Sequence, residues 1–199
     1  MIGIIDYGAG NLLSVKKAFA YIGIDGKLVR SPEDLRDIDK LVLPGVGAFY
    51  AAIEKLKTQQ LFEPIRAWAQ ADRPFLGICL GLQMLFEESD EFGSSPGLGV
   101  FRGRVPQFKA GKVPQIGWNQ VAQAQASPLW HGIDNQAFFY FLHGFYVDTP
   151  EESMIIGQTD YGITYTSAIQ RGNIYAVQFH PEKSGSVGLK LLENWVNIG

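Results

Sequence analysis

The chain has 199 residues, 46% of them hydrophobic and 19% charged, with a formal net charge of −3, which is typical of a folded globular protein. The mild negative charge argues against nucleic-acid binding, and no apolar run approaches the roughly 20 residues that a membrane helix needs. A single cysteine cannot form an internal disulfide and the N-terminal residues lack signal-peptide features, so we expect a cytoplasmic protein.

Strand and helix patterns alternate in the first half of the chain. Short apolar runs predict strands over 1–5, 27–30, 40–43 and 74–78. Apolar residues at helical spacing predict helices over 11–21, 48–57, 61–71 and 80–87, and Ser31 followed by Pro32 is typical of a helix start. Because crossover helices connect parallel strands, this alternation favours a parallel sheet covered by helices.

The second half is richer in aromatic and β-branched residues. These predict strands over 100–108, 137–148, 154–159, 164–170 and 173–179, with a tight turn at Arg171 and Gly172. A final helix is expected over about 187–198. We therefore predict a single α/β domain, residues 1–199, with a three-layer, mixed and largely parallel sheet flanked by helices and additional antiparallel strands in the second half.

The lone cysteine lies where a predicted strand meets a predicted helix. Gly77 and Gly81 bracket Cys79, so the chain can turn sharply and hold the thiol in an exposed, strained position. The following helix would direct its free N–H groups at the sulfur, which stabilises a thiolate, and the Leu80 N–H is placed to bind an oxyanion. A lone cysteine is often a buried, inert side chain, but the two glycines favour a nucleophile here.

A cysteine nucleophile needs a base, and the chain has three histidines. His131 has a surface-loop context, and His143 lies among aromatic residues and is better explained as a packed core histidine. His180 ends an apolar strand. In an extended chain the Glu182 side chain would point the same way as His180, accept a hydrogen bond from its ring N–H and fix the ring tautomer. Alone, the HPE sequence could equally be a strand end with a solvated acid.

A second glycine turn follows the predicted strand over 40–43. In the PGVG sequence of residues 44–47, Gly47 could bring a backbone N–H close to a ligand and supply a second oxyanion donor, although such a pattern is as often a plain turn. Three scattered histidines and one cysteine do not form a metal site, and the chain has neither a phosphate-binding loop of the Walker type nor a full dinucleotide fingerprint.

Three segments together resemble the signatures of the class I glutamine amidotransferases. They are PGVG at 44–47, GICLGLQ at 77–83 and HPE at 180–182, and the resemblance extends over nearly the whole chain. It implies that Cys79 attacks the side-chain amide of L-glutamine. His180 would then act as general base and general acid, and Glu182 would orient the His180 ring. No cofactor or metal is implied.

The same resemblance assigns further roles. The backbone N–H groups of Gly47 and Leu80 would form the oxyanion hole. A peptide near Val46 would have to flip before both groups could bind the oxyanion. The implied substrate-binding residues are Gly45, Gln83, Gly144 and Phe145, although Gln83 could otherwise be an exposed helix residue. Family members often have serine where this chain has Gly144, so a hydroxyl contact to the substrate is not expected there.

The segments DYGAGN at 6–11 and KVPQIGWN at 112–119 narrow the resemblance to members that deliver ammonia to a (β/α)8-barrel cyclase, as a heterodimer. By that resemblance Asn11, Trp118 and Lys183 would lie near the interface. Trp118 could equally be a packed core aromatic residue, and Lys183 a solvated lysine.

Other functions remain open from the sequence. A class I amidotransferase that feeds pyridoxal phosphate or anthranilate synthesis would share Cys79, His180 and Glu182. A degenerate, non-catalytic module would not need all three. A cysteine peptidase of similar fold is a more distant alternative, because nothing in the sequence suggests a peptide groove.

Overall fold

The computed structural model describes residues 1–8, 11–109 and 111–198. Within these residues one large sheet has the strand order β2-β1-β3-β4-β12-β11-β10-β8-β9, and a small sheet has the order β6-β5-β7. The large sheet consists of β1 Ile2–Ile5, β2 Lys27–Val29, β3 Lys40–Leu43, β4 Phe75–Ile78, β8 Gln115–Gln123, β9 Ala137–His143, β10 Ile155–Asp160, β11 Thr164–Arg171 and β12 Ile174–Val177. The small sheet consists of β5 Glu88–Ser89, β6 Ser95–Pro96 and β7 Arg104–Val105.

The large sheet changes character at β12. Strands β2, β1, β3, β4 and β12 are parallel neighbours, whereas β11, β10, β8 and β9 continue the sheet through antiparallel pairs. Strand β4 lies directly beside β12, with Ile78 opposite Val177. The carboxyl ends of these two strands therefore meet at one edge, which is where sheet enzymes place functional groups.

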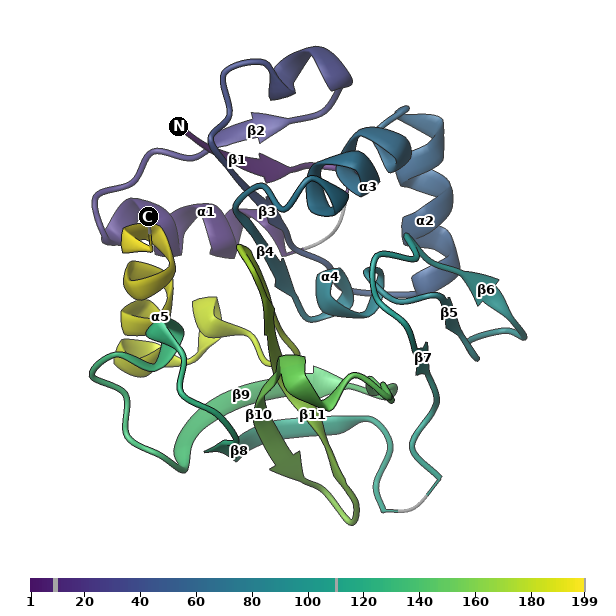
Figure 1. Ribbon diagram of the computed structural model, residues 1–199, viewed down its shortest axis with the longest axis vertical. Coiled ribbons are helices and arrows are strands. Elements are labelled where there is room, and N and C mark those ends of the chain that lie inside the picture. Colours follow the sequence, from purple (N-terminus) through teal and green to yellow (C-terminus); the bar gives the residue numbers. More distant parts are fainter. Residues whose placement is uncertain (9–10, 110, 199) are drawn as a thin grey trace.

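Helices cover both faces of the sheet and give the predicted three layers (Figure 1). One face packs against α2 and α3 through side chains such as Leu56 and Trp68, and the other against α1 and α5 through Phe19 and Trp195. The α-helices are α1 Leu12–Tyr21, α2 Phe49–Thr58, α3 Phe62–Gln70, α4 Leu80–Gln83 and α5 Gly185–Asn197. The 3-10 turns are η1 Pro32–Leu35, η2 Pro128–Trp130, η3 Glu152–Met154 and η4 Pro181–Lys183. None of the described helices is long and apolar enough to cross a membrane.

The strand predicted over 100–108 is wrong for most of its length. Only Arg104 and Val105 pair as a strand, while the N–H groups of Val100 and Phe101 both donate to the Leu85 carbonyl at 2.9 and 3.1 Å. The apolar run fills the core from a loop instead of joining a sheet.

The longest strand of the sheet, β8, was not predicted. Its sequence QIGWNQVAQ contains four amide side chains and lies near the edge of the sheet, so it lacks the apolar alternation on which the prediction relied.

The helix predicted over 80–87 is also shorter than expected. The α-helix α4 ends at Gln83, because the next N–H groups, of Leu85 and Phe86, bond three residues back in tight turns. Only a single turn of helix follows Cys79, so the electrostatic effect expected from a longer helix is reduced.

Candidate active site

Cys79 lies in a sharp turn between β4 and α4 that only small neighbours permit. A Cβ atom on Gly81 would collide with the Leu43 carbonyl oxygen, and one on Gly77 would lie 2.9 Å from the Gly81 backbone. Cys79 itself has φ 55° and ψ −106°, a conformation that L residues rarely adopt and that costs about 1–3 kcal/mol. The turn therefore fixes the sulfur at the carboxyl edge of the sheet, and its strained backbone confirms the prediction from the two glycines. The predicted exposure is wrong, because Cys79 is only 4% exposed.

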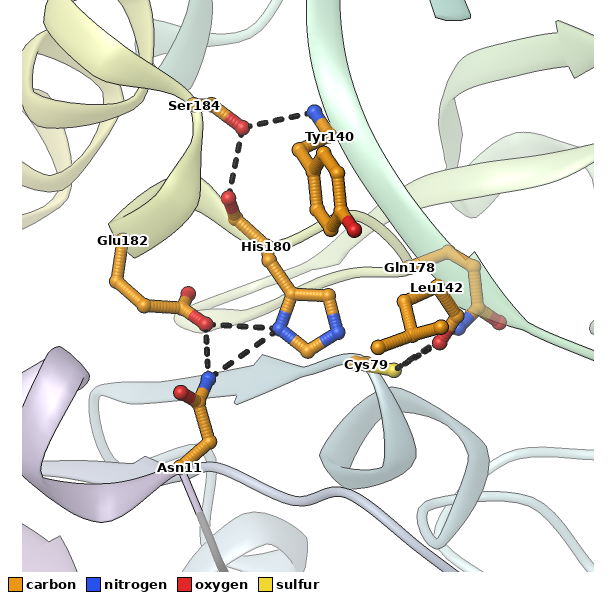
Figure 2. Close-up of polar contacts among 8 residues, drawn as sticks. All are labelled: Asn11, Cys79, Tyr140, Leu142, Gln178, His180, Glu182 and Ser184. Atoms are coloured by element: carbon orange, nitrogen blue, oxygen red, sulfur yellow. Dashed lines mark hydrogen bonds and ion pairs between the residues drawn. The ribbon is translucent and has the colours of Figure 1, made fainter. Parts of the chain in front are cut away.

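The structure brings His180 and Glu182 to the same place. Figure 2 shows the imidazole between the Glu182 carboxylate and Cys79. His180 Nδ1 lies 2.8 Å from Glu182 Oε1, and both side chains are fully buried. A carboxylate only accepts, so Nδ1 carries the hydrogen. The other ring nitrogen, Nε2, is on the Cys79 side and makes no hydrogen bond to any described residue.

The local backbone differs from the expected one. His180 is extended, with φ −102° and ψ 93°, but Pro181 begins the 3-10 turn η4 rather than a further extended residue. The turn carries Glu182 back onto the ring. Two hydrogen bonds hold His180 in place, from its N–H to the Tyr140 carbonyl at 2.8 Å and from the Ser184 hydroxyl to its carbonyl at 2.7 Å.

The charges around His180 favour its protonated form. Burial of the ring disfavours the positive charge, but negative charge at Cys79 and the hydrogen bond to Glu182 prevail and raise the pKa of His180 to about 10. The ring is therefore a strong acceptor for a proton that leaves the sulfur.

Asn11 joins this group, which sequence analysis did not anticipate. Its amide Nδ2 donates to Glu182 Oε1 and lies 3.5 Å from His180 Nδ1 (Figure 2). The side chain is 8% exposed, so little of it is available to a partner protein. The remaining residues of the DYGAGN segment include 9 and 10, which lie outside the described residues.

A cavity of about 180 Å³ opens beside the sulfur. Ten residues line it. They are Cys79, Val46, Gly47, Leu80, Gln83, Glu91, Leu142, His143, Gly144 and Phe145. Gly47 has φ +96° and open space where a side chain would be. Gly45 is not among the lining residues, and a Cβ atom there would collide with the Tyr7 hydroxyl. Five of the six predicted oxyanion and substrate residues therefore surround one pocket.

The Leu80 N–H is already engaged in this conformation. It donates to the Gly45 carbonyl at 3.4 Å, a long hydrogen bond across the two glycine turns. In this conformation the Gly45 carbonyl therefore occupies the hydrogen-bonding position in which the Leu80 N–H would bind an oxyanion.

Gln83 is not an exposed helix residue but a buried part of the pocket wall. Its Nε2 atom donates to the Phe145 carbonyl and to Gln178 Oε1, both at 3.0 Å. These two bonds use both hydrogens of the amide nitrogen and leave the oxygen for a ligand. Gly144 has room for a side chain, since an added Cβ would lie 3.4 Å from Val113.

Gln178 is a residue that sequence analysis missed. Its side chain is fully buried and its Nε2 atom lies 3.6 Å from Cys79 Sγ. Gln178 lies in the strand that the sequence predicted over 173–179, and residues two apart in an extended chain point to the same side, so its position two before His180 was a usable signal.

The other two histidines lie as expected. His131 is exposed, and His143 is buried with its Nδ1 2.7 Å from the Phe145 carbonyl and its Nε2 3.2 Å from the Tyr165 hydroxyl. Burial lowers the pKa of His143 to about 4, so this ring is neutral at pH 7.

Trp118 and Lys183 lie on the surface. Trp118 is 55% exposed and is therefore not a core residue. It lies on β8 opposite Tyr140 of β9, with ring centroids 6.1 Å apart, and the Lys183 ammonium lies 5.8 Å from the centre of the same Tyr140 ring. Ile116 and Phe138 are exposed on the same two strands.

Comparisons with known proteins agree with this geometry. The family model described as glutamine amidotransferase class-I matches residues 3–198. Curated relatives named imidazole glycerol phosphate synthase subunit HisH are 47% identical in Desulfitobacterium hafniense, over 99% of this chain and 95% of the relative, and 47% identical in Methanocaldococcus jannaschii, over the whole of both chains.

Solved structures are similar in fold at low sequence identity. One described as a glutamine amidotransferase has a TM-score of 0.77 at 20% identity and covers 98% of both chains. Another, the PurLQS structure from Thermotoga maritima, has a TM-score of 0.78 at 17% identity and covers 98% of this chain and 97% of the other. Identities this low support the fold alone.

Proposed function

The chain belongs to the class I glutamine amidotransferase family, and from this premise we propose that it is the glutaminase subunit of an imidazole glycerol phosphate synthase in histidine biosynthesis. It hydrolyses glutamine to glutamate and ammonia and passes the ammonia to a second subunit. The whole chain, residues 1–199, acts as one amidotransferase domain in the cytoplasm, where a lone cysteine stays reduced.

Cys79 is the nucleophile of this reaction. The thiol proton passes to His180 Nε2, and the sulfur attacks the side-chain carbonyl carbon of glutamine as a thiolate. The tetrahedral intermediate collapses to a glutamyl thioester as His180 returns that proton to the leaving nitrogen, which departs as ammonia. Water, deprotonated by the same nitrogen, then splits the thioester into glutamate and the free thiol.

Glu182 and Asn11 support His180. The carboxylate holds the hydrogen on Nδ1, which keeps Nε2 directed at the sulfur and stabilises the imidazolium that forms. Asn11 donates to the same carboxylate oxygen and so fixes its orientation. We therefore assign Asn11 to the catalytic group as an orienting residue, in addition to its expected position near the partner.

The pocket binds glutamine beside the sulfur. The backbone N–H groups of Gly47 and Leu80 stabilise the oxyanion, once the Gly45 carbonyl has turned away from Leu80. Gln83 accepts a hydrogen bond from the substrate ammonium through its free oxygen, and the backbone at Gly144 and Phe145 forms the opposite wall. Only glycine fits at position 45, because the Tyr7 hydroxyl occupies the space that a side chain would need.

The partner is a (β/α)8-barrel cyclase in a heterodimer, since ammonia released into water is protonated and lost as a nucleophile. The cyclase uses the ammonia to form imidazole glycerol phosphate and aminoimidazole carboxamide ribotide. The exposed face with Trp118 and Lys183 is the docking surface on this chain, and Ile116 and Phe138 add apolar area to it. No nucleic acid or membrane takes part.

The alignment of Glu182, His180 and Cys79 is the observation that carries this proposal. Substitution of the nucleophile tests it, with glutamine-dependent and ammonia-dependent synthesis measured in the complex with the cyclase. Cys79→Ser is expected to abolish synthesis from glutamine and to leave synthesis from added ammonium salt intact. Retained synthesis from glutamine would refute the assignment of Cys79. Pairing with a pyridoxal phosphate synthase instead of the cyclase would refute the pathway alone.

A further inference from the structure

A line of side-chain amides connects the glutamine pocket to the nucleophile. It runs from the Phe145 carbonyl through Gln83 to Gln178 and ends at the Cys79 sulfur. The successive separations are 3.0, 3.0 and 3.6 Å. Gln178 is the member whose side chain touches both Gln83 and the sulfur.

The carbonyl at the start of this line fixes the orientation of both amides. A backbone carbonyl only accepts, so the atom of Gln83 that faces Phe145 must be its nitrogen. The same nitrogen faces Gln178, which must therefore present its oxygen to Gln83. This leaves the Gln178 nitrogen as the atom that faces Cys79, so the sulfur receives an N–H donor.

The sulfur has a second contact, which favours the protonated thiol instead of the thiolate. Cys79 Sγ lies 3.8 Å from the Leu142 carbonyl, which can accept a hydrogen bond only from a protonated thiol. An N–H donor from Gln178 favours the thiolate instead, because hydrogen bonds to a charged acceptor are the stronger ones. Figure 2 shows Leu142 and Gln178 on the side of Cys79 away from Glu182.

Gln178 is held rigidly enough to act in this way. Its side chain is fully buried, and its backbone N–H donates to the Ser167 carbonyl of the neighbouring strand at 2.8 Å. Burial of an amide is costly unless its polar atoms are bonded, and here Gln83 and Cys79 provide both partners.

We propose that Gln178 is a positioning residue for glutamine hydrolysis, which donates a hydrogen bond to the Cys79 sulfur and links the sulfur to the substrate-binding amide of Gln83. The inference rests on the proposed function, since it takes Cys79 as the nucleophile. Gln178 does not touch the substrate; it stabilises the thiolate and directs it toward the pocket.

Gln178→Met tests this role, because methionine keeps the length of the side chain and removes the donor. Cys79 is the only cysteine in the chain, so the rate of alkylation by iodoacetamide reports this sulfur without background. The pH at which alkylation reaches half its maximal rate should rise in Gln178→Met. In the complex with the cyclase, kcat for glutamine should fall about tenfold with KM within about twofold, as expected for loss of one hydrogen bond to a charged group.

Gln178→Glu is a second version of the test that keeps the shape of the side chain. A carboxylate beside the sulfur repels the thiolate, so the alkylation profile should move to still higher pH. The matched control is Gln123→Met on β8, a strand glutamine whose Nε2 donates to the Ile133 carbonyl at 2.8 Å, away from the site. That variant should keep the alkylation profile and kcat of the unmodified chain.

The outcomes separate the inference from the proposed function. If folded Gln178→Met or Gln178→Glu keeps the alkylation profile of the unmodified chain, Gln178 is a packing residue and the inference is overturned. If instead Cys79→Ser retains glutamine-dependent synthesis, the proposed function itself is refuted. A higher alkylation pH with a lower kcat supports the positioning role.

Discussion

The Gly45 carbonyl oxygen accepts a hydrogen bond from the backbone N–H of Leu80 at 3.4 Å. In the proposed mechanism the same N–H stabilises the oxyanion, so the two acceptors compete for one donor. The peptide that carries the Gly45 carbonyl must turn before the intermediate is fully stabilised. Gly47, with open space at its φ of +96°, lies two residues further along and gives this segment room to change conformation.

From this competition we expect low glutaminase activity in the isolated chain and strong stimulation by the cyclase with its own ligand bound. Loss of one oxyanion donor typically lowers kcat by about 10²–10³-fold, which sets the scale of the stimulation. Glutamate release measured with the chain alone, with the cyclase, and with the cyclase plus ligand checks this. Equal turnover in all three samples would show that the Gly45 carbonyl does not limit the reaction.

The members of the catalytic group should differ in how much they contribute. His180→Ala removes the proton carrier and should lower kcat/KM at least about 10³-fold, whereas Glu182→Gln removes only its orienter and should cost about 10²-fold. Asn11→Ala should cost less again, since Asn11 acts through Glu182. Steady-state glutamine kinetics of the three variants in the complex would contradict this order if Glu182→Gln proved as damaging as His180→Ala.

His143 should make the protein less stable in acid. Burial lowers its pKa to about 4, so between pH 6.5 and 4 the unfolded chain binds a proton that the folded chain does not. Its contribution to the free energy of unfolding is complete above about pH 6.5 and is lost as the pH falls, by about 3 kcal/mol in total. His180, with a raised pKa, stays protonated in the folded state, and the unfolded chain completes its protonation within about one unit below pH 6.5, so His180 adds almost no slope at lower pH.

Urea unfolding at several pH values checks this prediction against His143→Gln, which removes the titrating ring. The free energy of unfolding of the unmodified chain should fall more steeply with decreasing pH than that of the variant. Parallel curves between pH 6.5 and 4 would mean that His143 does not resist protonation in the folded state.

The turn around the nucleophile should tolerate no side chain at Gly81. An alanine Cβ there would collide with the Leu43 carbonyl oxygen, a backbone atom that cannot move without displacing β3. We expect Gly81→Ala to lower the free energy of unfolding by about 3 kcal/mol or more. Thermal and urea unfolding measure the loss.

Gly99→Ala is the matched control for this substitution. Gly99 has a φ of +60° but open space around it, so alanine should cost only about 1 kcal/mol of backbone strain. A loss at Gly81 no larger than the loss at Gly99 would show that the close approach of α4 to β3 is not needed.

Local patterns predicted most of the elements that position the site. The strand before Cys79 and its two glycines, the strand before His180, and the helices of both faces follow from apolar spacing and turn residues, which are properties of neighbouring residues. The strand β8 was missed because its amide-rich sequence carries no such signal. The 3-10 turn at Pro181 was missed because an extended chain and a tight turn both suit a proline at that point.

The sequence by itself determined the family and predicted which side chains react, because the segments that carry them are short, contiguous and chemically distinctive. Only the tertiary structure decided how these side chains share hydrogen bonds. Asn11 reaches Glu182 across 171 positions, and Gln178 reaches Cys79 across 99, because the sheet brings distant strands and turns to one edge. Amides are common side chains with no signature of their own, so their role depends on the atoms that folding places beside them.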